Sequence, residues 1–87
     1  MKLNIDQLKK KIIYRSNYRG TKEMDKLLGA FTNTYIDKLN IDDLLDLEKL
    51  LNIDDSSLYD FYNGTPSKVE FKDNHINSLF KNFKYSK

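Results

Sequence analysis

The apolar residues of this chain recur three and four positions apart, and no segment alternates apolar with polar residues. Spacing of this kind places side chains on one face of an α-helix, whereas a half-buried strand needs strict alternation. A chain of 87 residues has room for one domain. We therefore expect an all-α protein, a compact five-helix bundle, formed as a single domain over residues 1–87, with residues 84–87 as a frayed tail.

Start and stop signals frame five helical segments. The expected helices cover residues 5–18, 21–39, 41–52, 56–62 and 73–83. Asn4 and Asn40 can cap the first and third helices, and Asp54 or Asp55 the fourth, because their side chains accept hydrogen bonds from free backbone N–H groups. Gly20 is suited to the position directly after the cap that ends the first helix, because glycine adopts a left-handed backbone without steric cost.

The apolar faces of these segments predict the core. Those expected to face inward from the first two segments are Ile5, Leu8, Ile12, Ser16, Met24, Leu27, Leu28, Phe31 and Tyr35. Gly29 is small enough to let a neighbouring helix approach closely. The third segment is apolar around more than half of its circumference, so we place it at the centre of the bundle. Val69 and Phe71 are expected to pin the following loop across the core.

Glu48 projects from the middle of the apolar face of the third segment. A lone buried carboxylate is costly, so such a group is paired or hydrogen-bonded in a stable protein. We expect its partner to be an Arg or Lys from the first two helices, or a tyrosine hydroxyl.

Several classes of site lack the residues they need. The chain has no Cys, so disulfide and thiolate chemistry are absent, and one histidine cannot form a zinc site without Cys. Its three glycines do not form a phosphate-binding loop. We predict no catalytic residue and no metal site, and we place His75 at a partly exposed rim.

No apolar run reaches the ~20 residues of a membrane span. The first residues lack the apolar stretch of a signal peptide, so we expect a cytoplasmic protein.

Charge is unevenly distributed along the chain. Residues 1–22 contain seven Lys or Arg and one Asp, whereas residues 37–60 contain eight acidic residues and two Lys. Phosphate contact by the basic segment is conceivable. Its cations are spread around the helix rather than aligned on one side, which is typical of a solvated surface, so we expect no nucleic-acid partner.

Arg15, Arg19, Gly20, Glu23 and Asp25 gather around the corner between the first and second helices. Acidic residues in the first turn of a helix commonly compensate the helix dipole, which accounts for Glu23 and Asp25 in general. Dipole compensation does not account for the whole cluster at one corner. We therefore take these residues as a candidate partner-binding site.

Residues 15–31 closely resemble the signature of the FAD assembly factors of succinate dehydrogenase. The hallmark of that family is Arg-Gly-x-x-Glu, usually followed by x-Asp and an apolar run, and it falls here on Arg19, Gly20, Glu23 and Asp25. Residues 47–51 and 54–61 also resemble family segments. The sequence departs from the family pattern at Phe61, where Trp is usual.

The resemblance implies a compact five-helix bundle that binds the flavoprotein subunit of succinate dehydrogenase, and sometimes that of fumarate reductase. It implies that binding promotes covalent attachment of FAD to a histidine of this client, without firm FAD binding by the chain itself and without enzymatic activity. Gly20 would leave the backbone bare for a partner, and Arg19 would offer a bidentate fork. Glu23 and Asp25 would pair with client cations or fix Arg19 in place.

Three other functions remain open from the residues alone. A generic helical adaptor for another protein is the first, and a small nucleic-acid binder is the second. An enzyme that uses Glu23 and Asp25 fits least, because no nucleophile or pocket supports it. We expect a monomer.

Overall fold

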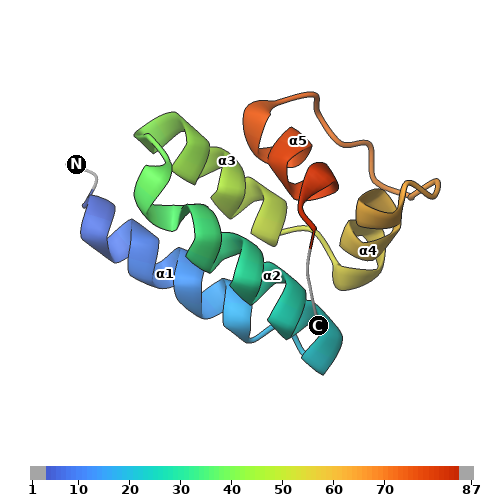
Figure 1. Ribbon diagram of the computed structural model, residues 1–87, viewed down its shortest axis with the longest axis horizontal. Coiled ribbons are helices and arrows are strands. Elements are labelled where there is room, and N and C mark those ends of the chain that lie inside the picture. The colour runs from blue at the N-terminus through green and yellow to red at the C-terminus, as the bar shows by residue number, and fades with distance from the viewer. Residues whose placement is uncertain (1–3, 85–87) are drawn as a thin grey trace.

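The computed structural model describes residues 4–84 and confirms the all-α fold. Its helices are α1 (Ile5–Asn17), α2 (Lys22–Tyr35), α3 (Ile41–Leu51), α4 (Asp55–Asn63) and α5 (His75–Asn82), with a short 3-10 helix, η1 (Ile36–Lys38), between α2 and α3. Helices α1 and α2 form an antiparallel pair, and α3 packs against α1 on one side and α5 on the other (Figure 1). Helix α4 packs against α5.

A side-chain cap begins each α-helix. Each cap accepts a hydrogen bond from the backbone N–H three residues further on, at distances between 2.7 and 3.3 Å. The capping residues are Asn4, Thr21, Asn40, Asp54 and Asn74. Such a cap satisfies an N–H group that has no partner inside its helix. The caps predicted at Asn4, Asn40 and Asp54 are therefore confirmed.

The second helix was expected to continue to residue 39, and this prediction is wrong. The α-helix ends at Tyr35, and the chain tightens into η1 before Leu39 adopts an extended backbone. The extended residue is needed because Asn40 must turn its side chain back onto the N-terminus of α3.

Most other helix ends differ from the predictions by one or two residues. Helix α1 ends at Asn17 with Tyr18 as its cap, so Gly20 lies two residues beyond the cap rather than directly after it. Gly20 still has a left-handed backbone, with φ of +109°. The last helix begins at His75 instead of residue 73, because Asn74 is its capping residue.

The core lies where α3 meets the other helices, as predicted from its apolar circumference. The buried hydrophobic residues are Leu8, Ile12, Met24, Leu27, Leu28, Phe31, Ile36, Leu44, Leu47, Leu50, Leu51, Leu58, Ile76 and Phe80. Ile5 is 46% exposed, so its predicted place in the core is wrong: the inward face of α1 begins one turn later, at Leu8. Tyr35 is half-buried against the core.

Aromatic packing holds the loop between α4 and α5 against the bundle. The ring of Phe71 stacks on that of Phe61 with a centroid distance of 4.0 Å, which confirms the anchoring role predicted for Phe71. Val69 is half-buried but does not join the core cluster, so its predicted role as a second anchor is wrong. Phe61 in turn packs on Phe80, so this aromatic contact connects the loop to the core.

Helices α1 and α2 approach closely where the last turn of α1 meets the second half of α2. The hydroxyls of Ser16 and Thr32, both buried, share a hydrogen bond of 2.6 Å across the contact. A Cβ at Gly29 would lie 2.5 Å from Oδ1 of Asn17, so only glycine fits without a shift of that side chain. The close approach predicted at Gly29 is confirmed.

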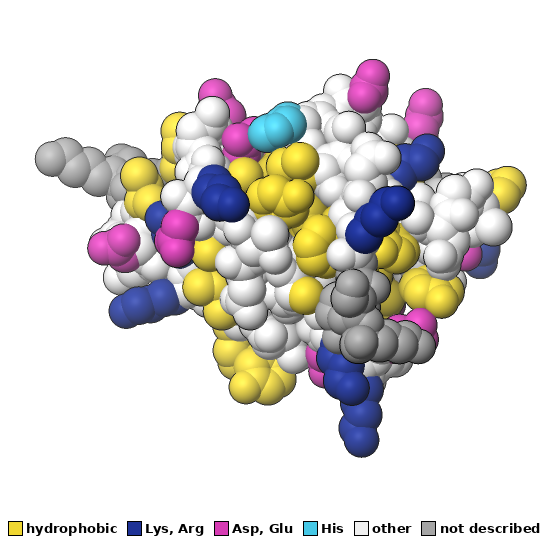
Figure 2. Space-filling model, viewed as in Figure 1, with side chains coloured by type: hydrophobic (Ala, Val, Ile, Leu, Met, Phe, Trp, Pro, Cys, Tyr) yellow, Lys and Arg dark blue, Asp and Glu magenta, His cyan; other side chains and the backbone are white. Residues whose placement is uncertain are grey.

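The partner expected for Glu48 is also present. Its carboxylate lies 2.9 Å from Nζ of Lys11 in α1, and 25% of its side chain is exposed. His75 is exposed and lies 3.3 Å from the Asp43 carboxylate. Figure 2 shows the histidine in cyan at the surface, beside acidic side chains in magenta. Over residues 4–84, no helix is long and apolar enough to cross a membrane.

Candidate partner-binding site

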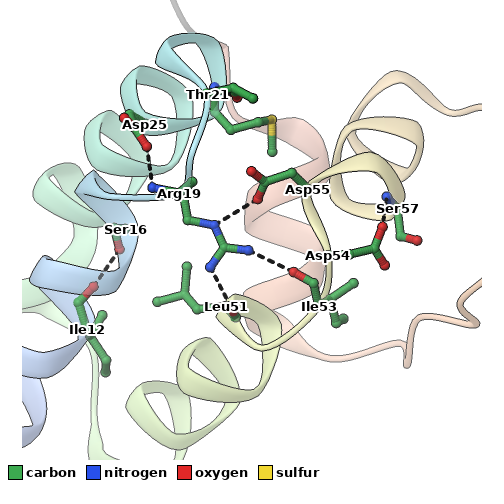
Figure 3. Close-up of polar contacts among 11 residues, drawn as sticks. Ile12, Ser16, Arg19, Thr21, Asp25, Leu51, Ile53, Asp54, Asp55 and Ser57 are labelled. Atoms are coloured by element: carbon green, nitrogen blue, oxygen red, sulfur yellow. Dashed lines mark hydrogen bonds and ion pairs between the residues drawn. The ribbon is translucent and has the colours of Figure 1, made fainter.

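Arg19 lies in the turn between α1 and α2 and reaches across to the turn between α3 and α4 (Figure 3). Its Nε donates to the Asp55 carboxylate at 2.9 Å, and its two terminal nitrogens donate to the carbonyls of Leu51 and Ile53 at 2.5 and 2.7 Å. Only 10% of the Arg19 side chain is exposed. The guanidinium is therefore committed to contacts within the chain.

These partners suit a cation for a local reason. Leu51 ends α3, so its carbonyl has no intrahelical donor and carries the negative end of the helix dipole. Asp55 begins α4, where the dipole favours a carboxylate. A planar guanidinium can serve both carbonyls and the carboxylate at once, which a lysine ammonium cannot do with the same geometry.

The backbone of the same turn is held from the opposite side. The Asp25 carboxylate, in the first turn of α2, accepts a hydrogen bond from the backbone N–H of Arg19. Gly20 is exposed, and nothing lies within 4 Å of the position a Cβ would take there. The structure thus fixes Arg19 on both sides and leaves the backbone of Gly20 open to a partner.

Arg15 and Glu23 lie on different sides of this turn. Arg15 is half-buried in α1 and lines an open hollow of about 530 Å³ shared with Arg19 and the α3–α4 turn. Glu23 is exposed and lines a separate hollow of about 640 Å³ between α2 and α4. The structure therefore brings Arg19, Gly20 and Asp25 together, and places Arg15 and Glu23 beside them in two hollows. Partner binding by these five residues stays a prediction.

The α3–α4 turn belongs to the corner, although the sequence interpretation assigned it only a capping role. Hydrogen bonds from the side chain and the backbone N–H of Ser57 lower the pKa of Asp54, because they stabilise its ionised form. Asp55 and the two carbonyls lie 32 to 36 residues from Arg19 along the chain. No local pattern could have indicated those pairings.

Among the residues that the structure describes, no cluster of His, Cys, Asp or Glu is suited to a metal ion.

Replacing Arg19 by lysine tests how much the hydrogen bonds of its guanidinium contribute to stability. We expect Arg19→Lys to lower the free energy of unfolding by about 2 kcal/mol, because at least one hydrogen bond from a charged donor is lost and a carbonyl is left unpaired. Arg15→Lys is the matched control, since Arg15 makes no ion pair within residues 4–84, and it should change stability by less than about 0.5 kcal/mol. Urea unfolding followed by circular dichroism measures both. Equal stability of the two variants would show that the hydrogen bonds of the Arg19 guanidinium contribute little to folding.

Comparison with known proteins finds relatives whose similarity includes this corner. Residues 10–84 match the family model described as the flavinator of succinate dehydrogenase, a span that includes all five candidate residues. The FAD assembly factor SdhE of Acetobacter pasteurianus is 33% identical over 61 residues, which cover 70% of this chain and 56% of that protein.

Eukaryotic relatives are similar over comparable spans. The mitochondrial succinate dehydrogenase assembly factor 2 of Lodderomyces elongisporus is 30% identical over 81 residues, covering 88% of this chain and 49% of the relative. The protein of the same name from Dictyostelium discoideum is 39% identical over 57 residues, covering 66% of this chain and 40% of the relative.

The chain spans about half the length of the curated relatives it matches. No solved structure shows a significant match. Because the family model covers most of the sequence and includes the whole Arg19–Gly20 corner, this chain belongs to the family of the flavinator of succinate dehydrogenase.

Proposed function

We propose that this chain is an assembly factor that binds the flavoprotein subunit of succinate dehydrogenase and promotes covalent attachment of FAD to it. The observation that carries the proposal is the family match over residues 10–84, which includes the exposed turn at Gly20. Relatives are named as an FAD assembly factor and as succinate dehydrogenase assembly factors. The flavoprotein subunit of fumarate reductase is a second client of the same kind.

The geometry of the corner supports docking in which some residues would contact the client and others hold the turn in place. Gly20 lets a partner approach the backbone closely, because no side chain covers it. Glu23 offers an exposed carboxylate to a client cation. The Arg19 guanidinium donates to three groups inside the chain, so on this proposal it positions the turn, in place of the client contact expected from the resemblance.

Binding of this kind acts through a population shift. A binder stabilises whichever client conformation it contacts better, and the bond-forming chemistry then belongs to the client and the flavin. We propose that the chain is not an enzyme and holds no FAD firmly. The two hollows at the corner are open to solvent, whereas a cofactor pocket encloses most of its ligand. Monomeric state and cytoplasmic location remain predictions.

Co-expression tests the function directly. The flavoprotein subunit of succinate dehydrogenase is expressed with and without this chain, and covalent flavin is read by in-gel fluorescence after denaturation. A parallel arm uses the subunit of fumarate reductase. We expect stronger fluorescence with the chain present for at least one client. Equal fluorescence with and without the chain for both clients would refute the proposal.

Neutralising Glu23 tests its contact with the client. We expect Glu23→Gln to weaken client binding roughly tenfold, because an interfacial carboxylate that pairs with a cation is lost. Glu70→Gln is the matched control, since Glu70 is also exposed but lies in the loop before α5. It should leave affinity unchanged. Isothermal titration calorimetry with the purified client measures both. Equal affinities of the two variants would remove Glu23 from the interface.

A methyl group at Gly20 tests the bare backbone. Gly20→Ala and Gly64→Ala place an L side chain at φ values of +109° and +75°, both with open space around the new Cβ. Each should lower stability by about 1–2 kcal/mol. We expect only Gly20→Ala to reduce covalent flavin in co-expressed client, because only that Cβ stands in the docking surface. Equal flavin loss in both variants would assign the effect to stability alone.

A further inference from the structure

Helix α1 carries three exposed apolar side chains outside its buried, core-facing side. Ile13, Tyr14 and Tyr18 are 36%, 65% and 69% exposed, and the two tyrosine rings contact each other with a centroid distance of 4.7 Å. A helix that covers a core on one side is normally polar on the other. Exposed aromatic groups held together in this way are typical of an interaction surface. We call these three residues the tyrosine ridge.

The ridge stands between two hollows. On one side, Lys10 and Asn17 complete an open hollow of about 510 Å³ with the ridge itself. On the other side lies the hollow of about 530 Å³ that Arg15 lines. Figure 2 shows hydrophobic side chains gathered at the lower edge of the molecule, where the second half of α1 lies. The ridge can therefore insert between groups of a partner that fill the two hollows.

Charge around the ridge indicates the chemistry of the partner. Lys9 and Lys11 form ion pairs with acidic residues of this chain, at 3.6 and 2.9 Å. Lys10 and Arg15, one beside each hollow, form no ion pair within the described part of the chain. Two free cations beside an aromatic ridge are complementary to a surface that presents carboxylates next to an apolar side chain.

The ridge also continues into the corner already described. Tyr18 directly precedes Arg19, and both line the same hollow. The acidic wall of that hollow is already committed, because Asp55 pairs with Arg19 and Asp54 caps α4. Carboxylates of a partner would therefore lie toward Lys10 and Arg15 rather than toward the α3–α4 turn.

We propose that the outward face of α1 is a second part of the docking surface and binds a segment of the flavoprotein subunit that presents carboxylates beside an apolar side chain. This inference rests on the proposed function, because the proposed function identifies the client. It adds a contact surface of about two helical turns, formed by residues outside the Arg19–Gly20 motif.

The first experiment removes the aromatic rings. We expect the double variant Tyr14→Ala/Tyr18→Ala to bind the purified apo-flavoprotein subunit at least roughly tenfold more weakly in calorimetry, because buried tyrosines are frequent anchors of interfaces. Ile5→Ala is the matched control: Ile5 is 46% exposed on the same helix but far from the ridge. It should keep the affinity of the wild type. Unchanged affinity of the double variant, beside normal binding by the wild type, overturns the inference and leaves the proposed function intact.

The second experiment removes the charges and keeps the ridge. Lys10→Gln/Arg15→Gln should slow association with the same subunit and flatten its dependence on salt, as loss of complementary charges does. Lys38→Gln/Lys72→Gln removes two exposed lysines elsewhere and should preserve both. An unchanged association rate and salt dependence for Lys10→Gln/Arg15→Gln contradicts an acidic partner surface.

Two further outcomes separate the possible failures. If the wild-type chain does not bind the subunit at all, the proposed function fails, and the inference fails with it. Sedimentation of the free chain tests a second copy as the occupant. A wild-type dimer that Tyr14→Ala/Tyr18→Ala converts to a monomer assigns the ridge to self-association and overturns the inference, whereas a wild-type monomer supports it.

Discussion

The guanidinium of Arg19 joins the two ends of the candidate site. It donates to the last carbonyl of α3, to the carbonyl of Ile53 and to the carboxylate that begins α4. Both carbonyls would otherwise lie near the core without a donor, which is costly in a partly desolvated place. Because the same residue sits in the α1–α2 turn, one side chain fixes how two turns more than 30 residues apart meet. Gly20 is the next residue along the chain and is exposed.

On the proposed function, only some residues of this motif would contact the partner, and the others would hold the turn in place. The Arg19 side chain holds the α1–α2 turn through its hydrogen bond to Asp55, and Asp25 holds the same turn by accepting from the backbone N–H of Arg19. Gly20 in this turn and Glu23 at the start of α2 remain exposed. Rigid presentation favours binding, since less conformational freedom is lost when the partner docks. The tyrosine ridge of α1 would extend the same rigid surface, because it projects from a helix whose other face is locked into the core.

Local chemistry made much of the fold predictable. The caps at Asn4, Asn40 and Asp54, and the helical spacing of the core residues, depend on neighbours within one or two turns. The break between α2 and η1 was missed because it depends on where the next helix must start. The partners of Arg19 were missed for a related reason: a sequence does not show which turns meet in space. The resemblance located the motif in the sequence, but it did not indicate which side chains of the motif face the interior of the protein.

Reconstitution with purified components tests the central claim most directly. Apo-flavoprotein subunit of succinate dehydrogenase is incubated with FAD, with or without an excess of this chain, and intact-protein mass spectrometry follows the fraction of the subunit that carries covalent FAD. The account predicts that the chain raises the rate of attachment and is itself recovered unmodified. A rate that stays the same at saturating concentrations of the chain would contradict it.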